Sequence, residues 1–252
     1  LDDIIINKLN CISIKKSLKY INLLFNNKYE NITLLIINDR LHLISKYNKI
    51  VKCIKNKPVI EQRSLEWYNM RKNMITASDF AQAIGKGKFG SSKQFYRNKC
   101  GYEENTFNSN MEPLQWGIRY EQVATKMYEF KSRTKVTEFG LIQHDIYDFL
   151  GASPDGINNL GIMLEIKCPW KRVKTETIPE QYEIQIQGQL EVCNLEECDY
   201  FECYITEYSS YEHMINDETI YFKGIVFSNN SNLFKSPYFS LIGNLGSSKK
   251  SF

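Results

Sequence analysis

Three residues, Asp155, Glu165 and Lys167, have the types and spacing of a site for metal-assisted hydrolysis. Side chains alternate between the two faces of a β-strand, so the acid and the lysine of Met163-Leu-Glu-Ile-Lys-Cys-Pro point to one face. Asp155 lies in a Pro-Asp-Gly turn just before this run, where a neighbouring strand could place it beside Glu165. Two carboxylates and a backbone carbonyl suit a hard cation such as Mg²⁺, and an ammonium suits a water or phosphate oxygen.

This pattern has a simpler alternative. An acid followed at loose spacing by Glu-x-Lys arises roughly once by chance in a chain of this composition, so the pattern alone is not specific. A Pro-Asp-Gly turn and a salt bridge on an edge strand would give the same residues. Other blocks along the chain must therefore decide between a site and a structural feature.

The elements expected around these residues describe an α/β domain. A helix is predicted to begin at Ser64 and a short one near Thr76 and Ser78, and residues 114–131 show an apolar stripe at helical spacing. Strand-like runs follow at 136–144, 147–152 and 161–168, then a helix at 179–193 and strands at 199–206 and 219–227. This order predicts a central mixed sheet flanked by helices.

Residues 1–57 differ from the rest of the chain. They lack Gly and Pro and are rich in Ile, Leu, Asn and Lys, which favours uninterrupted helices, although residues 32–37 could equally form a strand. Pro58 marks a plausible joint. We therefore expect a mainly helical appendage at 1–57 and a second domain at 58–252, which contains Asp155, Glu165 and Lys167.

Charge and composition limit the classes of protein. With 42% hydrophobic and 24% charged residues, the chain is typical of a globular protein and not of a disordered one. No apolar run approaches the ~20 residues of a membrane-spanning helix, and no signal peptide is recognisable. The net charge of +3 hides a basic segment 1–60, net +7, and an acidic segment 176–222, net −12. The basic regions could face a polyanion or simply be solvated.

The seven cysteines are unevenly spaced and odd in number, which favours a reducing intracellular compartment over a secreted disulfide framework. Cys193, Cys198 and Cys203 raise the question of an iron–sulfur cluster, but their even spacing does not match the usual ligand patterns. We expect buried thiols there. His42, His144 and His213 show no pairing typical of zinc and are expected to be structural.

Five blocks in order give the chain a resemblance from about residue 61 to 227. They are Trp67-Tyr-Asn-Met-Arg-Lys-Asn-Met-Ile-Thr-Ala-Ser, Trp116-Gly-Ile-Arg-Tyr-Glu, Ser153-Pro-Asp-Gly, Leu164-Glu-Ile-Lys-Cys-Pro and Gln185-Ile-Gln. The chain thereby resembles the lambda-exonuclease-like viral recombinase nucleases (YqaJ-type) of the PD-(D/E)xK superfamily, and it looks similar to giant-virus members. The resemblance implies a restriction-endonuclease-like core.

The resemblance also assigns roles to matching positions. Asp155, Glu165, Glu121 and the carbonyl of Ile166 match the ligands of a divalent metal. Lys167 matches the lysine that orients or activates the attacking water, and Gln185 matches a glutamine near that water. Residues that match the binding site for the terminal 5′-phosphate lie in the first block: Arg71, Thr76 and Ser78. Seen without the resemblance, Glu121 could be an exposed helical charge, Gln185 a helix-surface amide and Ser78 a helix cap alone.

The function implied is a Mg²⁺-dependent deoxyribonuclease, with Mn²⁺ able to substitute, that degrades duplex DNA from 5′ ends. The residues alone imply only metal-assisted hydrolysis of phosphodiesters. An endonuclease or single-strand nuclease on the same core, and a non-enzymatic DNA-binding recombination adaptor, stay open as alternatives. The family also suggests a homo-oligomer, a single-strand-annealing or other recombination partner and, for a viral protein, the host cytoplasm or virus factory.

Overall fold

The computed structural model describes residues 30–88, 90–102, 111–171, 177–218, 222–224 and 250–251. The chain divides into two compact units, Leu1–Tyr47 and Asn48–Phe252. The described part of the first unit belongs to helix α2 (Glu30–Lys55), so residues 32–37 are helical. The domain boundary expected after residue 57 stays a prediction. None of the helices that the structure describes combines the length and apolar character needed to span a bilayer.

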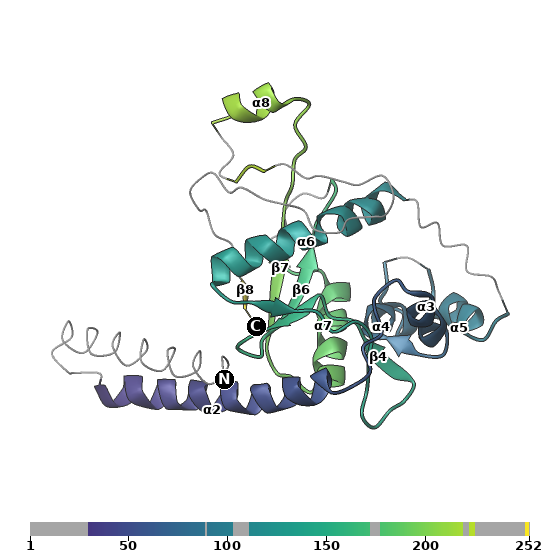
Figure 1. Ribbon diagram of the computed structural model, residues 1–252. Coiled ribbons are helices and arrows are strands. Elements are labelled where there is room, and N and C mark those ends of the chain that lie inside the picture. Colours follow the sequence, from purple (N-terminus) through teal and green to yellow (C-terminus); the bar gives the residue numbers. More distant parts are fainter. Residues whose placement is uncertain are drawn as a thin grey trace. The chain divides into compact units, whose positions relative to one another are not determined.

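The described residues of the second unit form two mixed sheets at its centre (Figure 1). The larger has the order β2-β5-β6-β7-β8, in which β6 and β7 run parallel and the other pairs antiparallel. Its strands are β2 (Val136–Thr137), β5 (Gly156–Asn158), β6 (Met163–Lys167), β7 (Cys198–Glu202) and β8 (Lys250–Ser251). The smaller has the order β1-β4-β3, formed by β1 (Ile75–Thr76), β4 (Leu150–Ala152) and β3 (Ile142–Gln143).

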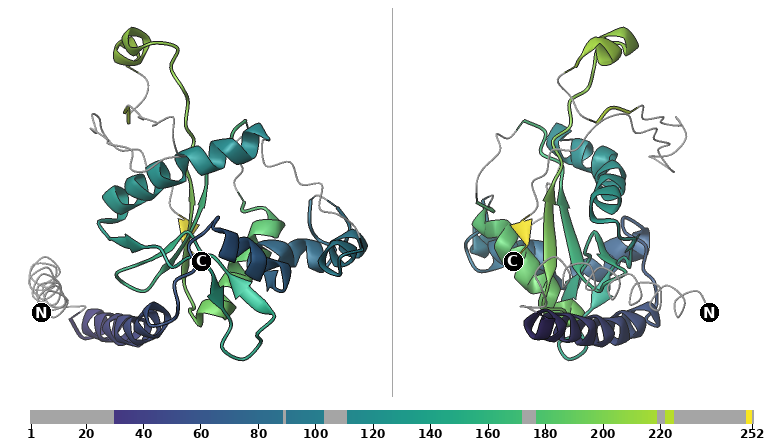
Figure 2. Two further views of the ribbon diagram at one scale, coloured as in Figure 1. Left: turned by 45° about the vertical axis from the view of Figure 1, so that its right-hand side comes forward. Right: turned by 90° about the vertical axis from the view of Figure 1, so that its left-hand side faces the viewer.

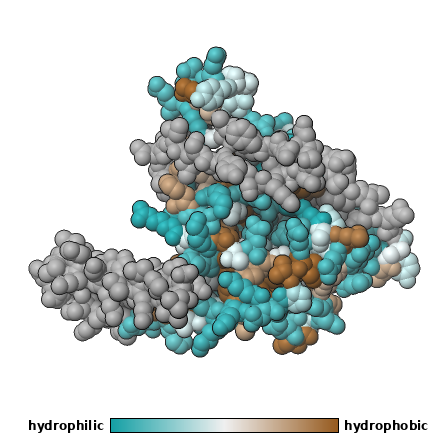
Figure 3. All heavy atoms as spheres, viewed as in Figure 1, coloured by the Kyte–Doolittle hydropathy of each residue, from teal (hydrophilic) through white to brown (hydrophobic). Residues whose placement is uncertain are grey.

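Helices cover both faces of the larger sheet, and α6 and α7 lie on opposite faces (Figure 2). Among its described residues, the second unit has, beyond α2, the helices α3 (Leu65–Lys72), α4 (Ala77–Ala83), α5 (Ser92–Lys99), α6 (Glu112–Ser132), α7 (Glu180–Cys193) and α8 (Tyr211–Asn216). The expected mixed sheet flanked by helices is confirmed. On the face shown in Figure 3, hydrophobic side chains form separate patches among hydrophilic ones, as expected when the apolar faces of helices point inward.

The core between α6 and the larger sheet is built from a few large side chains. Ala124 and Tyr128 of α6 pack against Leu164, Ile166 and Phe201. Since a fully buried Leu, Ile or Phe side chain contributes ~1.5–3 kcal/mol, this layer holds α6 firmly against β6 and β7. Residues that point away from it on β6 must then face α7.

Helix α7 is the crossover that two parallel strands require between them. It ends at Asn194, whose left-handed backbone (φ 54°) closes the last turn. Its other face packs against α4 at Gly188, where a Cβ atom would come within 2.5 Å of the Phe80 ring. Glycine at this position therefore lets α4 and α7 approach closely.

The strand predicted at 136–144 is wrong as one element. Gly140 has a left-handed backbone (φ 67°) and bridges Ile60, so the chain turns there and contributes β2 to the larger sheet and β3 to the smaller. The predicted strands at 147–152 and 199–206 are shorter than expected, and β5 was not anticipated. Of the strand expected at 219–227, residues 219–221 and 225–227 lie outside the described residues.

Glu129 links the end of α6 to the start of the sheet. It is 8% exposed; its Oε1 accepts a hydrogen bond from the Val136 amide (3.0 Å) and its Oε2 accepts one from Lys126 Nζ (3.0 Å). Burial acts to raise the pKa of Glu129, but the Val136 amide and Lys126 outweigh it and the pKa lies below its usual value. The ionised form is therefore the one that stabilises the fold.

We expect Glu129→Gln to lower the free energy of unfolding by ~1–3 kcal/mol at neutral pH, because a charge-assisted hydrogen bond is lost. A lowered pKa in the folded state means that this contribution is present above the pKa of the unfolded chain and disappears as the pH falls through the folded value. Urea unfolding at pH 7 and below pH 4 measures the difference. Glu183→Gln, at an exposed position of α7, is the control; the same pH dependence in both variants would contradict the assignment.

Candidate active site

The floor of the candidate site is formed where β5 and β6 pair. Asp155 directly precedes β5, and the antiparallel register sets Gly156 opposite Leu164. Asp155 is thereby placed beside β6, and its Oδ2 accepts a hydrogen bond of 2.6 Å from the Ile166 amide. The structure thus brings Asp155 next to the strand that carries Glu165.

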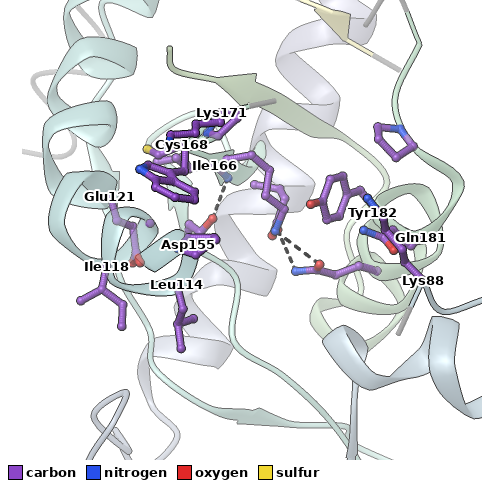
Figure 4. A pocket seen from close by; sticks show the side chains of 18 of the residues that line it. Lys88, Leu114, Ile118, Glu121, Asp155, Ile166, Cys168, Lys171, Gln181 and Tyr182 are labelled. Carbon is purple, nitrogen blue, oxygen red and sulfur yellow. Dashed lines mark hydrogen bonds and ion pairs between the residues drawn. The ribbon is translucent and has the colours of Figure 1, made fainter. Parts of the chain in front are cut away.

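Glu165 is 1% exposed and surrounded by donors. Lys167 Nζ and Gln185 Nε2 (2.7 Å) donate to its Oε1, and Gln189 Nε2 donates to its Oε2 (2.8 Å). A dashed line in Figure 4 marks the neighbouring hydrogen bond between Ile166 and Asp155. Gln189 was not anticipated, although its position one turn after Gln185 places it on the same face of α7.

Lys167 is held from two sides. Apart from its contact with Glu165, its Nζ lies 4.7 Å from the centre of the Tyr182 ring, a cation–π distance. Burial acts to lower the pKa of Lys167, but Glu165 and Asp155 outweigh it and raise the pKa above the usual lysine value. Lys167 is therefore a positively charged hydrogen-bond donor at neutral pH.

The pKa of the Asp155 carboxyl is also raised, but for an acid this favours the neutral form instead of the charged one. Burial, Glu165 and Glu121 all raise its pKa well above the usual value, while Lys167 and the Ile166 amide act in the other direction. Three carboxyl groups are therefore close enough to repel one another, and Lys167 compensates only part of their charge.

A cleft of about 850 Å³ opens above this floor. Glu121 of α6, one turn after Gly117, lines it together with Asp155, Glu165 and Gln185 (Figure 4). The cleft is also lined by cationic side chains from three other segments: Arg63, Lys86, Lys88 and Lys171. Acids at the base can bind a metal ion that contacts a phosphate group, and the cations around them attract the negatively charged phosphates. This is the arrangement expected for a site that binds a phosphate chain with the help of a metal ion.

The acids fit a hard divalent cation, because a positive ion among Asp155, Glu165 and Glu121 would relieve their repulsion. Within the ranges that the structure describes, however, no three His, Cys, Asp or Glu side chains are already grouped as a metal site. Glu121 instead pairs with Arg63, whose Nη2 donates to its Oε2 at 2.7 Å. Of the predicted ligands, Asp155 and Glu165 converge on the floor, whereas Glu121 is engaged elsewhere.

The predicted phosphate-binding residues form a second group, which does not line the cleft. Arg71 Nη2 donates to Ser78 Oγ (3.1 Å), and the hydroxyls of Thr76 and Ser78 lie 3.2 Å apart. Burial lowers the pKa of Arg71, although Asp79 acts against this effect. Asp79 also accepts from Thr76 Oγ1 (2.9 Å) and lies 3.6 Å from Arg71, so it fixes the group from behind.

Trp67 connects the two groups. The Arg71 guanidinium lies 4.4 Å from the centre of its ring, and its Nε1 donates to Ser153 Oγ (3.1 Å), two residues before Asp155. Lys99 supports the same region by donating to the carbonyls of Arg71 (2.7 Å) and Met74 (2.6 Å). Neither role was anticipated, because no local sequence pattern brings α5 next to the end of α3.

The remaining candidate residues have structural surroundings. Cys193 and Cys198 are buried, and burial raises the pKa of Cys193 to about 12 and of Cys203 to about 11. These thiols are therefore protonated at neutral pH, and the expectation of no iron–sulfur cluster stays a prediction. His144 Nδ1 accepts from the amides of Ile146 and Tyr147 (both 3.0 Å), as a turn-stabilising residue does.

A sequence profile of the YqaJ-like viral recombinase domain matches residues 66–196, which is more than half of the chain and includes both groups of residues. The chain belongs to this family. The YqaJ-like domain thus contains β6, the Asp155 turn, α6 and α7, so the elements that build the cleft are those of the family.

Known relatives of this YqaJ-like chain include viral proteins. An uncharacterised protein of Acanthamoeba polyphaga mimivirus is 32% identical over 192 residues, which cover 68% of this chain and 34% of that protein. A protein of African swine fever virus is 25% identical over 171 residues, 56% of this chain and 48% of that protein. The chain therefore spans between a third and a half of these relatives, and the likeness to a giant-virus protein is confirmed.

Among solved structures, the YqaJ-like chain is similar to an alkaline exonuclease (LHK-Exo) from Laribacter hongkongensis. The two are 27% identical, with a TM-score of 0.49, over 56% of this chain and 74% of the exonuclease.

We expect Gln189→Leu to lower the free energy of unfolding by ~1–3 kcal/mol, because Oε2 of a buried carboxylate loses its donor. Thermal or urea unfolding measures this cost. Gln187→Leu makes the same chemical change two residues earlier, at an exposed position of α7, and serves as the control. Equal stability changes in the two variants would show that the amide of Gln189 does not hold Glu165.

Proposed function

We propose that this chain is a divalent-metal-dependent deoxyribonuclease that hydrolyses DNA phosphodiesters, acting as a 5′-to-3′ exonuclease on duplex DNA. The observation that carries the proposal is the convergence of Asp155, Glu165 and Lys167 at the base of a cation-lined cleft, in a YqaJ-like domain. An acid pair with an adjacent ammonium is suited to phosphodiester hydrolysis and has no evident use in a simple adaptor.

Asp155, Glu165 and the carbonyl of Ile166 would hold a Mg²⁺ ion, with Glu121 as a further ligand, and Mn²⁺ would be able to substitute. When bound, the ion supplies positive charge where negative charge develops on the phosphate. Lys167 can donate a hydrogen bond to a phosphate oxygen or to the attacking water, since it stays charged. Gln185 holds Glu165 in place and has its amide at the cleft wall, where it can orient the same water.

The group of Arg71, Thr76 and Ser78 would bind the terminal 5′-phosphate. A guanidinium contacts a phosphate through two parallel hydrogen bonds, and the exposed Ser78 hydroxyl beside it can add another. Thr76 is 1% exposed and donates to Asp79, so its part in the group is to hold Ser78 at 3.2 Å. Ser78 lies in the first turn of α4 and is exposed, so its hydroxyl can reach a ligand beside Arg71. A requirement for a free 5′ end would follow from this group and not from the acids.

The function is tested by digestion of end-labelled linear duplex and of a covalently closed circle, each in Mg²⁺ and in EDTA. We expect digestion of the linear duplex in Mg²⁺ only, and an intact circle. Cleavage of the circle would indicate an endonuclease on the same core, and no digestion of either substrate would indicate an adaptor. A 3′ label lost before a 5′ label would contradict the proposed polarity.

Asp155→Asn and Glu165→Gln are each expected to reduce the rate of hydrolysis by about 100-fold or more, because a negative metal ligand worth ~3 kcal/mol or more in the transition state is lost. DNA binding should change little, since neither acid attracts the phosphate chain directly. Initial rates and binding by fluorescence anisotropy measure the two effects. Near-normal turnover in either variant would refute the assignment of the acids.

Arg71→Ala is expected to slow digestion of 5′-phosphorylated duplex by roughly ten- to hundredfold, the equivalent of ~1.5–3 kcal/mol for a lost charge-assisted contact. The effect on 5′-hydroxyl duplex should be much smaller, because that contact is already missing. Arg71→Lys keeps the charge without the planar fork and should recover only part of the rate.

Matched initial rates on the two kinds of end measure this difference. Lys72→Ala, the exposed neighbour of Arg71 on α3, is the control for a lost positive charge. An equal effect of Arg71→Ala on both ends would show that Arg71 serves the fold or contacts DNA elsewhere.

A further inference from the structure

Arg63 is one of the cationic residues that line the cleft. It is a non-glycine residue with a left-handed backbone (φ 67°), in the turn just before α3. The turn is closed by a hydrogen bond from the Ser64 amide to the Glu61 carbonyl (3.2 Å) and is preceded by the bridge from Ile60 to Gly140. The backbone of Arg63 is thereby held beside the cleft, while its long side chain can still change rotamer.

The side chain of Arg63 reaches across to α6, where its Nη2 lies 2.7 Å from Glu121 Oε2. Both residues line the cleft, and their side chains are 43% and 29% exposed. A partly exposed ion pair of this kind is weakly held and can exchange with ions from solution. The contact is therefore strong enough to occupy Glu121 and weak enough to be displaced.

The other charges near this pair show why it forms. Glu138 also faces it: burial and Glu121 raise the pKa of Glu138, while Arg63 and Lys126 act in the other direction. Lys126 is itself engaged with Glu129 at 3.0 Å. On the α6 side of the cleft Arg63 thus compensates acids in the way that Lys167 does on the β6 side.

We propose that Arg63 is the cation that neutralises Glu121 when no divalent cation is bound, and that Arg63 transfers to a DNA phosphate in the cleft when a divalent cation takes its place. The inference rests on the proposed function for the identity of the phosphate ligand. Glu121 cannot serve the guanidinium and a metal ion equally well at the same oxygen, so the two cations compete. Once released, the guanidinium remains at the wall of the cleft, where bidentate contact with phosphate is its preferred interaction.

Such an exchange makes the two ligands cooperative. Binding of a divalent cation frees Arg63 for DNA, and DNA that holds Arg63 frees Glu121 for the cation. Each ligand must then raise the affinity for the other by the same factor.

The first test titrates Mn²⁺ without DNA, following the electron paramagnetic resonance signal of the free ion. We expect Arg63→Gln to bind Mn²⁺ about 3- to 10-fold more tightly than the wild type, since a competing charge is gone. Arg63→Gly should behave in the same way and suits the left-handed backbone, so it guards against a folding defect in the first variant. Arg63→Lys should lie between the wild type and Arg63→Gln.

The second test repeats the Mn²⁺ titration with a short fluorescent duplex whose terminal linkages are phosphorothioates, which slow hydrolysis. In the wild type the duplex should tighten Mn²⁺ binding, and Mn²⁺ should tighten duplex binding by the same factor. Both Arg63→Gln and Arg63→Gly should lose most of this mutual effect.

Arg119→Gln is the matched control. Arg119 lies on α6, like Glu121, but it is paired with Glu207 at 3.0 Å and does not line the cleft. Its removal changes the net charge equally, and its Mn²⁺ affinity should stay within about twofold of the wild type. Equal tightening in Arg119→Gln and Arg63→Gln, or no tightening in the Arg63 variants, would overturn the competition. Unchanged coupling to DNA in the Arg63 variants would overturn the transfer.

These outcomes are separate from the test of the proposed function. If the wild-type chain digests no DNA but the Arg63 variants bind Mn²⁺ more tightly, the proposed nuclease activity is contradicted and the competition at Glu121 is supported. If the wild-type chain digests DNA but the Arg63 variants bind Mn²⁺ no more tightly, the proposed function is supported and the competition is contradicted.

Discussion

A carboxylate without access to water must be satisfied by the protein around it, and Glu165 is in that position. Its own strand supplies Lys167, but the other two donors, Gln185 and Gln189, come from α7. These amides reach Glu165 only if α7 lies flat against β6. The crossover between the parallel strands sets the direction of α7. The close packing of α7 on α4 at Gly188 sets how near α7 lies to the sheet. The packing of α7 on α4 is therefore part of the site's chemistry, because it brings these two amides to the Glu165 carboxylate.

The features of this arrangement that depend on residues close together in the sequence could be predicted from the sequence. The alternation in β6 correctly separates Leu164 and Ile166, which pack on α6, from Glu165, which faces α7. The length and apolar stripe of α6 and the bounds of α7 were also predicted within a few residues. Each of these features follows from a period of two or of 3.6 residues, so a single segment contains all the information.

Features that depend on distant segments could not be predicted. A left-handed glycine at 140 divides one apparent strand between two sheets, because its backbone must meet Ile60 and not because of its local pattern. In the same way, nothing near Arg63 in the sequence indicates that it meets Glu121. The predicted acids converge as expected on the floor, yet the partner of the third acid is visible only in three dimensions. The family pattern therefore indicates which residues could bind a metal ion, but it does not indicate that Glu121 is paired with Arg63.

Trp67 gives the two groups of residues a fixed separation. Its ring supports the Arg71 guanidinium on one side and its Nε1 holds Ser153, next to the Asp155 turn, on the other. An indole is rigid, so the span between a phosphate held at Arg71 and a linkage held at the acids cannot stretch as it could across a flexible loop. Under the proposed function, this separation would help to set how many nucleotides lie between the terminal phosphate and the linkage that is cleaved. The released products would then have a uniform length, independently of the sequence of the DNA, because the Trp67 ring keeps the two groups of residues at a fixed distance.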